Sequence, residues 1–145
     1  TSFCCLGELA KSSERVIFTI EDPVEILLPD VEQVEVDLND DSAFRETFAA
    51  VLASDPDVLF LSSSVAPRHR ATLWSHALSA AESGHLVFVQ IDAISTTHAQ
   101  ELFEAAVERS VEEQLVGVVW QELQKNPETG RRIALYDFAS GPLGG

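Results

Sequence analysis

Short apolar runs alternate along the chain with longer stretches in which apolar side chains recur every three or four residues. The runs Arg15–Ile20, Asp57–Leu61 and His85–Ile91 are rich in β-branched and aromatic residues, which is typical of buried strands. The helical spacing predicts helices over Asp41–Ala53 and from Pro67 to about Glu82. Buried strands separated by helices of this length indicate βαβ units. The pattern therefore predicts an α/β fold with a mainly parallel sheet and helices on both faces.

The weaker parts of the pattern complete the prediction. Further expected elements are a helix over Thr1–Lys11, a hairpin of short strands at Glu25–Leu28 and Gln33–Val36 around a turn at Pro29 and Asp30, helices over Thr97–Arg109 and Ser110–Gln124, and a strand over Arg131–Phe138. Asp41 or Ser42 is expected to cap the helix that begins there. Residues 1–140 are predicted to form a single domain, and residues 141–145 a flexible tail.

The charge balance narrows the choice of partner. The chain has 145 residues and a net charge of -15, from 9 basic and 24 acidic residues. Phosphate contacts need concentrated Lys and Arg, so we do not expect binding to nucleic acid or to an acidic membrane surface. No apolar run approaches the ~20 residues of a membrane span, and no signal peptide opens the chain. We therefore expect a cytoplasmic protein with protein partners, in which Cys4 and Cys5 are reduced packing residues.

Five motifs follow one another along the chain. They are Thr19–Glu25 (TIEDPVE), Asp55–Leu61 (DPDVLFL), Ala80–Phe88 (AAESGHLVF), Gly117–Leu123 (GVVWQEL) and Gly130–Ala134 (GRRIA). In this order and spacing they resemble the Asp box, the Walker B strand, the His box and the segment after it in the ATPases that drive type IV pili and type II secretion. The resemblance leans towards the pilus-retraction, PilT-like branch. It implies a RecA-like P-loop NTPase sheet, of which this chain is the second half, with the P-loop strand absent or truncated.

The resemblance also implies where nucleotide chemistry would take place. ATP and Mg²⁺ are the cofactors it implies, and phosphoryl transfer needs carboxylates at the carboxyl ends of adjacent strands. The matching residues are the Asp-box acids Glu21, Asp22 and Glu25 near the metal, Asp57 in Walker B, His85 on the phosphate side, and Thr1 as a candidate for the end of Walker A. The other histidines, His69, His76 and His98, show no metal-ligand spacing.

Several positions depart from the family pattern. No GxxxxGK[ST] loop occurs in the chain, and the Gly-Glu that ends Walker B is replaced by Ser62 and Ser63. The other replaced positions are Val34, Ala49 and Ala53 in place of Arg, Val65 and Ala66 in place of Arg-Asp, and Asp92 in place of the second His of the His box. A serine hydroxyl is not a general base near pH 7, and losing a general base costs on the order of 10²–10⁴ in rate. A lost arginine finger costs on the order of 10³–10⁵.

These departures predict a pseudo-ATPase that keeps the sheet as a scaffold. Such a domain would be an assembly or regulatory module of pilus, twitching-motility or secretion machinery. It would associate with itself or with motor subunits, and through them with the inner face of the membrane. One alternative is the second half of an active ATPase whose Walker A lies upstream of Thr1 and in which Glu21 compensates for Ser63. A second alternative is a flavodoxin-like or receiver-like binding module. Against it, such domains need a phosphate loop or an acidic pocket near the first strand, and the sequence indicates neither there.

Simpler interpretations stand beside the functional ones. The acids of TIEDPVE are also compatible with a solvated turn, because proline ends the strand before them. His85 is equally compatible with a hydrogen-bonded structural role. Trp74 and Trp120 lie in predicted helices beside apolar neighbours, so core packing is favoured over subunit contacts.

Overall fold

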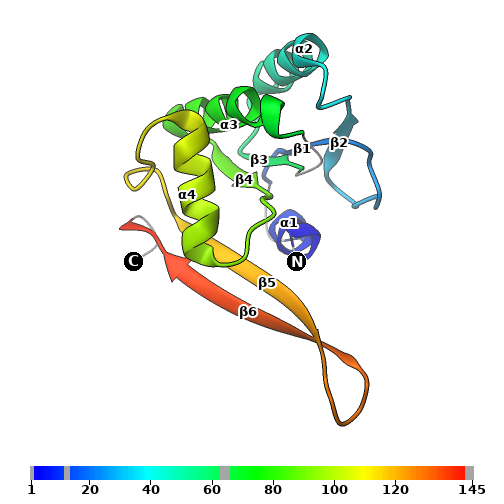
Figure 1. Ribbon diagram of the computed structural model, residues 1–145. Coiled ribbons are helices and arrows are strands. Elements are labelled where there is room, and N and C mark those ends of the chain that lie inside the picture. The colour runs from blue at the N-terminus through cyan, green and yellow to red at the C-terminus, as the bar shows by residue number, and fades with distance from the viewer. Residues whose placement is uncertain (1, 12–13, 63–65, 143–145) are drawn as a thin grey trace. The chain divides into compact units, whose positions relative to one another are not determined.

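The computed structural model describes residues 2–11, 14–62 and 66–142. The chain divides into two compact units, Thr1–Ile91 and Asp92–Gly145, and each is described by itself (Figure 1). The single domain predicted over residues 1–140 remains a prediction. Of the predicted tail, residues 143–145 lie outside the described part of the chain.

The first unit is built on a four-stranded parallel sheet. Its strands are β1 (Ile17–Glu21), β2 (Glu32–Glu35), β3 (Val58–Leu61) and β4 (Leu86–Val89), in the order β2-β1-β3-β4. The expected α/β class with a parallel sheet is confirmed. Since all four strands run in the same direction, their carboxyl ends lie along one edge of the sheet, where Glu21 ends β1 and Glu35 ends β2.

One face of this sheet packs against α1 (Ser2–Lys11). Side chains alternate between the faces of a strand, so Ile17, Val58 and Phe60 share one face. These three residues form a buried cluster with Leu6 of α1. The ring of Phe3 lies 5.6 Å from that of Phe60, centroid to centroid. The helix predicted at the start of the chain is therefore confirmed, and Leu6 is its buried contribution to the core.

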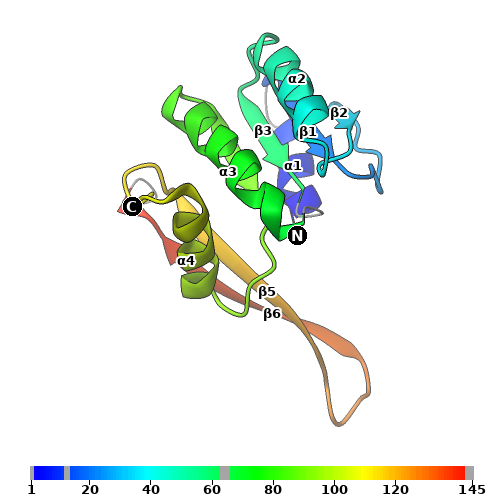
Figure 2. The ribbon, with the colours of Figure 1, turned by 45° about the horizontal axis from the view of Figure 1, so that its top comes forward.

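Two helices, α2 (Asp41–Leu52) and α3 (Pro67–Glu82), cover the other face (Figure 2). The strand residues that alternate to this side, Ile20, Leu59 and Leu61, are fully buried. The helices contribute the buried side chains Phe44, Phe48, Val51, Leu73, Trp74, Ala77, Leu78 and Ala80. Helices thus lie on both faces, as the pattern predicts, and the core position expected for Trp74 is confirmed.

The second unit combines a helix and a hairpin. Helix α4 (Thr96–Val107) precedes β5 (Gly117–Lys125) and β6 (Arg132–Ser140), which pair antiparallel. In the turn between the strands, the side chain of Asn126 accepts two backbone N–H groups, both at 2.9 Å. Gly130 has a φ of 68°, a left-handed conformation that suits glycine and closes the turn.

The hairpin predicted at Glu25–Leu28 and Gln33–Val36 is wrong. Only β2 forms, and it pairs parallel with β1, through Phe18 and Glu32 at the start of the ladder. Residues 25–28 form no strand, because their backbone is held by a side chain: Leu28 N donates to Oε1 of Gln33 at 2.6 Å. The turn predicted at Pro29 and Asp30 is present, but it leads into a strand that runs parallel to β1 and not into the second strand of a hairpin.

The helix predicted over Ser110–Gln124 is also wrong. Residues 117–125 form β5, which pairs along its whole length with β6. The spacing of apolar residues suited a helix, but Val118, Val119 and Trp120 favour a strand, and pairing with β6 decides between the two. Trp120 is therefore a half-buried strand residue, and its Nε1 donates to the backbone oxygen of Ala93 at 3.0 Å.

Two smaller expectations also need correction. The cap of α2 is Asp40, one residue before the predicted candidates, and its side chain accepts the N–H groups of Ser42 and Ala43. Cys4 and Cys5 are free, but both are exposed on α1 and so are not packing residues. Within the described residues, no helix is long and apolar enough to cross a membrane.

Candidate functional site

A buried carboxylate ends β1 at the carboxyl edge of the sheet. Glu21 is only 1% exposed. Its Oε1 accepts two hydrogen bonds, one from Oγ1 of Thr19 at 2.6 Å and one from Nε2 of Gln33 at 2.9 Å. A buried carboxylate is costly unless it is hydrogen-bonded, so these two donors are what allow Glu21 to stay in place. Thr19 and Gln33 therefore belong to the site as much as Glu21 does.

Polar side chains tie together the loops that follow the strands. Oδ2 of Asp22, after β1, accepts the N–H of Leu38 at 3.0 Å. Oε2 of Glu35, at the end of β2, accepts the N–H of Val24 at 2.9 Å. Asp22 and Glu35 thus form reciprocal links between the loops after β1 and β2. The Asp22 carboxylate, expected near a metal, serves here as a backbone acceptor.

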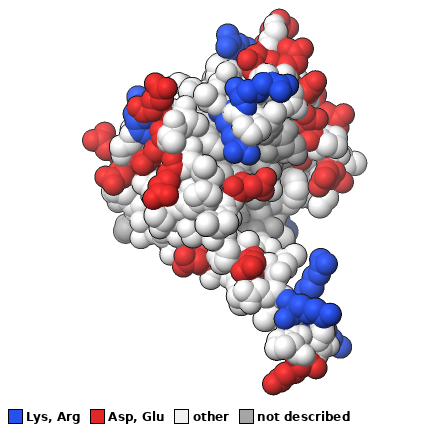
Figure 3. All heavy atoms as spheres, in the orientation of Figure 1, with Lys and Arg blue, Asp and Glu red and all other residues white. Residues whose placement is uncertain are grey.

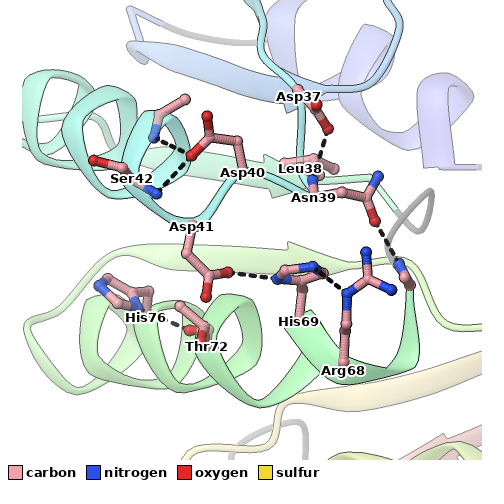
Figure 4. Close-up of polar contacts among 12 residues, drawn as sticks. Asp37, Leu38, Asn39, Asp40, Asp41, Ser42, Arg68, His69, Thr72 and His76 are labelled. Carbon is pink, nitrogen blue, oxygen red and sulfur yellow. Dashed lines mark hydrogen bonds and ion pairs between the residues drawn. The ribbon is translucent and has the colours of Figure 1, made fainter.

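A further polar chain joins the first turns of α2 and α3 (Figure 4). His69 Nδ1 lies 2.7 Å from Oδ1 of Asp41, and Nε of Arg68 donates to His69 Nε2 at 2.8 Å. An arginine Nε–H can only donate, so Nε2 carries no proton and Nδ1–H donates to Asp41. Asn39 Oδ1 accepts the N–H of Ala66 at 3.0 Å. Ala66, the residue before α3, is thereby anchored to the loop that leads into α2.

Two residues that the resemblance assigns to the site lie at the opposite ends of the strands. Oδ2 of Asp57 accepts the N–H of Val16 at 2.8 Å, just before β1 begins. His85 Nδ1 lies 2.6 Å from the backbone oxygen of Pro56, just before β4 begins. Both contacts fasten the amino ends of β1, β3 and β4. The structure does not bring Asp57 or His85 together with Glu21, and the structural role weighed for His85 fits its position.

The remaining predicted site residues fall in several places. Glu25 is exposed in the loop after β1, Ser62 is half-buried directly after β3, and Asp92 is exposed in the second unit. Thr1 and Ser63 lie outside the described residues, as does Val65. Of the positions at which the family has arginine, Ala49 and Ala53 are exposed and Val34 is half-buried. Packing would not exclude a long charged side chain at the two exposed positions.

The described residues offer few of the side-chain groupings that ATP and Mg²⁺ need. Among the described residues, no three acidic, histidine or cysteine side chains are grouped so as to hold a metal ion. The two lysines of the chain lie elsewhere: Lys11 pairs with Glu8 on α1 at 2.7 Å, and Lys125 is on β5. The chain contains no GxxxxGK[ST] phosphate-binding loop.

Sequence reasoning missed the partners of Glu21. A signal was present, because Thr19 and Glu21 are polar residues two apart in an otherwise apolar strand, and so face the same side. Buried polar groups need partners, which predicts a donor from a neighbouring strand. No pattern in the sequence indicated the Asp41–His69 pair, since these residues are 28 positions apart on separate helices.

Comparison with known proteins agrees with the motifs. Residues 1–129 match the model of the family described as "Type II/IV secretion system protein". The chain is 29% identical to "Type II secretion system protein HxcR" of Pseudomonas aeruginosa over 92% of this chain and 28% of that protein. It is 33% identical to "Uncharacterized protein YggR" of Escherichia coli, over 92% of this chain and 43% of that protein. It is 30% identical to "Type IV pilus assembly ATPase PilB" of Thermus thermophilus, over 93% of this chain and 16% of that protein. The chain thus spans less than half of each relative.

Proposed function

Because this chain belongs to the type II/IV secretion system protein family, we propose that it is a catalytically degenerate module of a motor ATPase from that family. In this proposal it serves assembly or regulation of a pilus, twitching-motility or secretion machine, as a cytoplasmic part that reaches the membrane only through partner subunits. A place in the pilus-retraction, PilT-like branch is the finer form of the proposal, supported by the AAESGHLVF and GRRIA motifs.

The observation that carries the proposal is the engagement of the retained acids in structural contacts. Glu21 and Asp22 accept hydrogen bonds from Gln33 and from the backbone of Leu38. The Gly-Glu of Walker B is replaced by serines, and a hydroxyl cannot activate water near pH 7. Ala49, where the family has arginine, is exposed, so an arginine there would carry no packing cost. These losses are the kind that spares the fold and removes turnover.

The test is ATP hydrolysis by the full-length protein that contains this chain. With MgATP we expect no hydrolysis above a protein-free blank, and no increase in rate when the MgATP concentration is raised. The relevant comparison is a variant with Ser62→Gly and Ser63→Glu, which restores the family sequence after β3. Steady turnover by the unmodified protein at rates of about 1 s⁻¹ or more, the lower end of ordinary enzymes, would contradict the proposal.

The runner-up is an active ATPase whose phosphate loop lies outside this chain. The observation in its favour is the intact carboxylate of Glu21, held at the carboxyl edge where parallel sheets carry their chemistry. On this reading Glu21→Gln abolishes hydrolysis while Glu46→Gln, at an exposed acid on α2 outside the motif, leaves it unchanged. Hydrolysis that is insensitive to Glu21→Gln would exclude Glu21 as the catalytic acid, and absence of hydrolysis would exclude the runner-up.

A further inference from the structure

The β5–β6 hairpin has one face that contacts α4 and one that does not. Trp120 and Asp137 are cross-strand partners, and their side chains bond to Ala93 and Thr96 at the start of α4. Because side chains alternate, the next residues along each strand point away from α4. This outer surface, here called the hairpin face, carries Val119, Leu123, Tyr136 and Phe138, which are 55%, 56%, 61% and 63% exposed.

Two cations continue the hairpin face towards the turn. Lys125 and Arg132 are direct cross-strand partners and share the face of Leu123. Like charges directly opposite each other destabilise a hairpin, and no ion pair joins either residue to an acid among the described residues. Figure 3 shows basic side chains gathered at this end of the hairpin. An anionic partner would relieve the repulsion.

The rest of the chain is strongly acidic. Three of its nine basic residues and one of its 24 acidic residues lie between Lys125 and Arg132, which leaves six basic and 23 acidic residues elsewhere. An anionic membrane or a nucleic acid would be repelled by the acidic remainder of the chain. The basic end of the hairpin face, in contrast, is attracted to an acidic protein surface such as that remainder in another copy. The charge distribution therefore favours the acidic surface of a second copy as the partner.

The first unit presents a surface of matching chemistry, the Leu27 loop (residues 25–32). Ile26 and Leu27 at its tip are 51% and 84% exposed. Acids flank them at Glu25, Asp30 and Glu32. The loop is held in place, because the amide of Gln33 donates to Ile26 O at 2.9 Å and accepts Leu28 N at 2.6 Å. A rigid loop loses little entropy on binding, so its apolar tip is prepared for a partner.

We propose that the hairpin face of one copy binds the Leu27 loop of a second copy. Ile26 and Leu27 would pack on the apolar part of the hairpin face, and the flanking acids would pair with Lys125 and Arg132. Two unlike surfaces meet, so the contact is head to tail and each copy keeps one free surface of each kind. The inference rests on the proposed role as an assembly module, and it names the surfaces that such a role would use.

The test is sedimentation velocity of the 145-residue chain over a range of concentrations and salt. We expect self-association that weakens as salt rises, since exposed ion pairs are screened. A hairpin variant (K125E with R132E) and a loop variant (I26S with L27S) should each raise the dissociation constant by about tenfold or more. Mixed in equal amounts, the two variants should form a dimer that does not grow, because each retains the surface that the other has lost.

Two control variants match the changes in chemistry. Arg45→Glu reverses the charge of an exposed cation on α2, outside both proposed surfaces, and Ile94→Ser removes an apolar side chain that is 79% exposed in the second unit. Neither should weaken association. A chain that stays monomeric at every concentration, controls as weak as the variants, or no complex on mixing would each overturn the proposal. ATP hydrolysis is measured separately, so failure here is distinguishable from failure of the proposed function.

Discussion

Gln33 is the residue whose removal tests the candidate site most directly. Its side chain makes three hydrogen bonds: to Glu21 Oε1 at 2.9 Å, to Ile26 O at 2.9 Å and from Leu28 N at 2.6 Å. Gln33→Ala removes all three and leaves a carboxylate that is 1% exposed with only Thr19 as its donor. The variant should therefore lose stability and also release the loop after β1.

The expected loss follows from the kind of bond. A hydrogen bond to a charged group contributes about 1.5–3 kcal/mol, and a neutral one about 0.5–1.5 kcal/mol. The bonds to Ile26 and Leu28 lie near the surface, where water replaces much of what is lost. We therefore expect Gln33→Ala to lower the free energy of unfolding by about 2–4 kcal/mol. Gln124→Ala, which removes an exposed bond to Glu122 at 2.9 Å, should cost less than about 0.5 kcal/mol.

Urea denaturation followed by circular dichroism measures the loss, and hydrogen exchange locates it. In Gln33→Ala the amide of Leu28 should exchange faster, because its acceptor is gone. Amides in the hairpin of the second unit should change little. A loss below about 1 kcal/mol, or one equal to that of Gln124→Ala, would show that Gln33 does not support Glu21 in the way described.

Three further predictions concern turns, caps and pH. Gly141→Ala should destabilise the second unit strongly in thermal unfolding, because a Cβ there would clash with the backbone oxygen of Leu115. The matched control Gly7→Ala, on α1, has open space around its Cβ and should be neutral or slightly stabilising. Asp40→Ala removes the cap of α2 and should cost about 0.5–2 kcal/mol in urea denaturation, whereas Asp40→Asn should retain most of the stability. The pKa of Glu104 is lowered from 4.5, chiefly because its carboxylate accepts the backbone N–H of Val111. Its stabilising effect is therefore present above pH 4.5 and lost as the pH falls below that value, so the wild type should exceed Glu104→Gln at pH 7 and the difference should fade in acid. A difference that grows in acid would contradict this.

The parts of the fold that were predictable are determined by residues within each element itself. The strands β1, β3 and β4 are short apolar runs that favour strands; β1 and β3 are buried as predicted, whereas the residues of β4, at the sheet edge, are only half-buried. Helix α3 begins at Pro67 because proline fits the first turn of a helix. The partners of these elements follow from the preference of βαβ units for parallel pairing. The parallel sheet and its two helical layers therefore needed no knowledge of distant contacts.

The parts that were mispredicted depend on contacts between distant residues. Residues 117–125 are a strand because β6 pairs with them, and nothing within the segment excludes a helix. Residues 25–28 are not a strand because Gln33 binds their backbone. In the site, the position of Glu21 was predictable from the end of β1, but its hydrogen-bond donors, Thr19 and Gln33, are side chains whose direction no local pattern fixes.

The two edges of the parallel sheet differ in their resistance to aggregation. On β2 the edge strand reads Glu-Gln-Val-Glu, and charges on an edge discourage another chain from adding a strand. On β4 the edge strand reads Leu-Val-Phe-Val, and among the described residues no strand pairs with its outer side. Short apolar, uncharged segments of this kind nucleate cross-β assembly. We therefore expect β4 to be the strand of this sheet most prone to cross-β assembly, and a lysine in that strand to reduce aggregation.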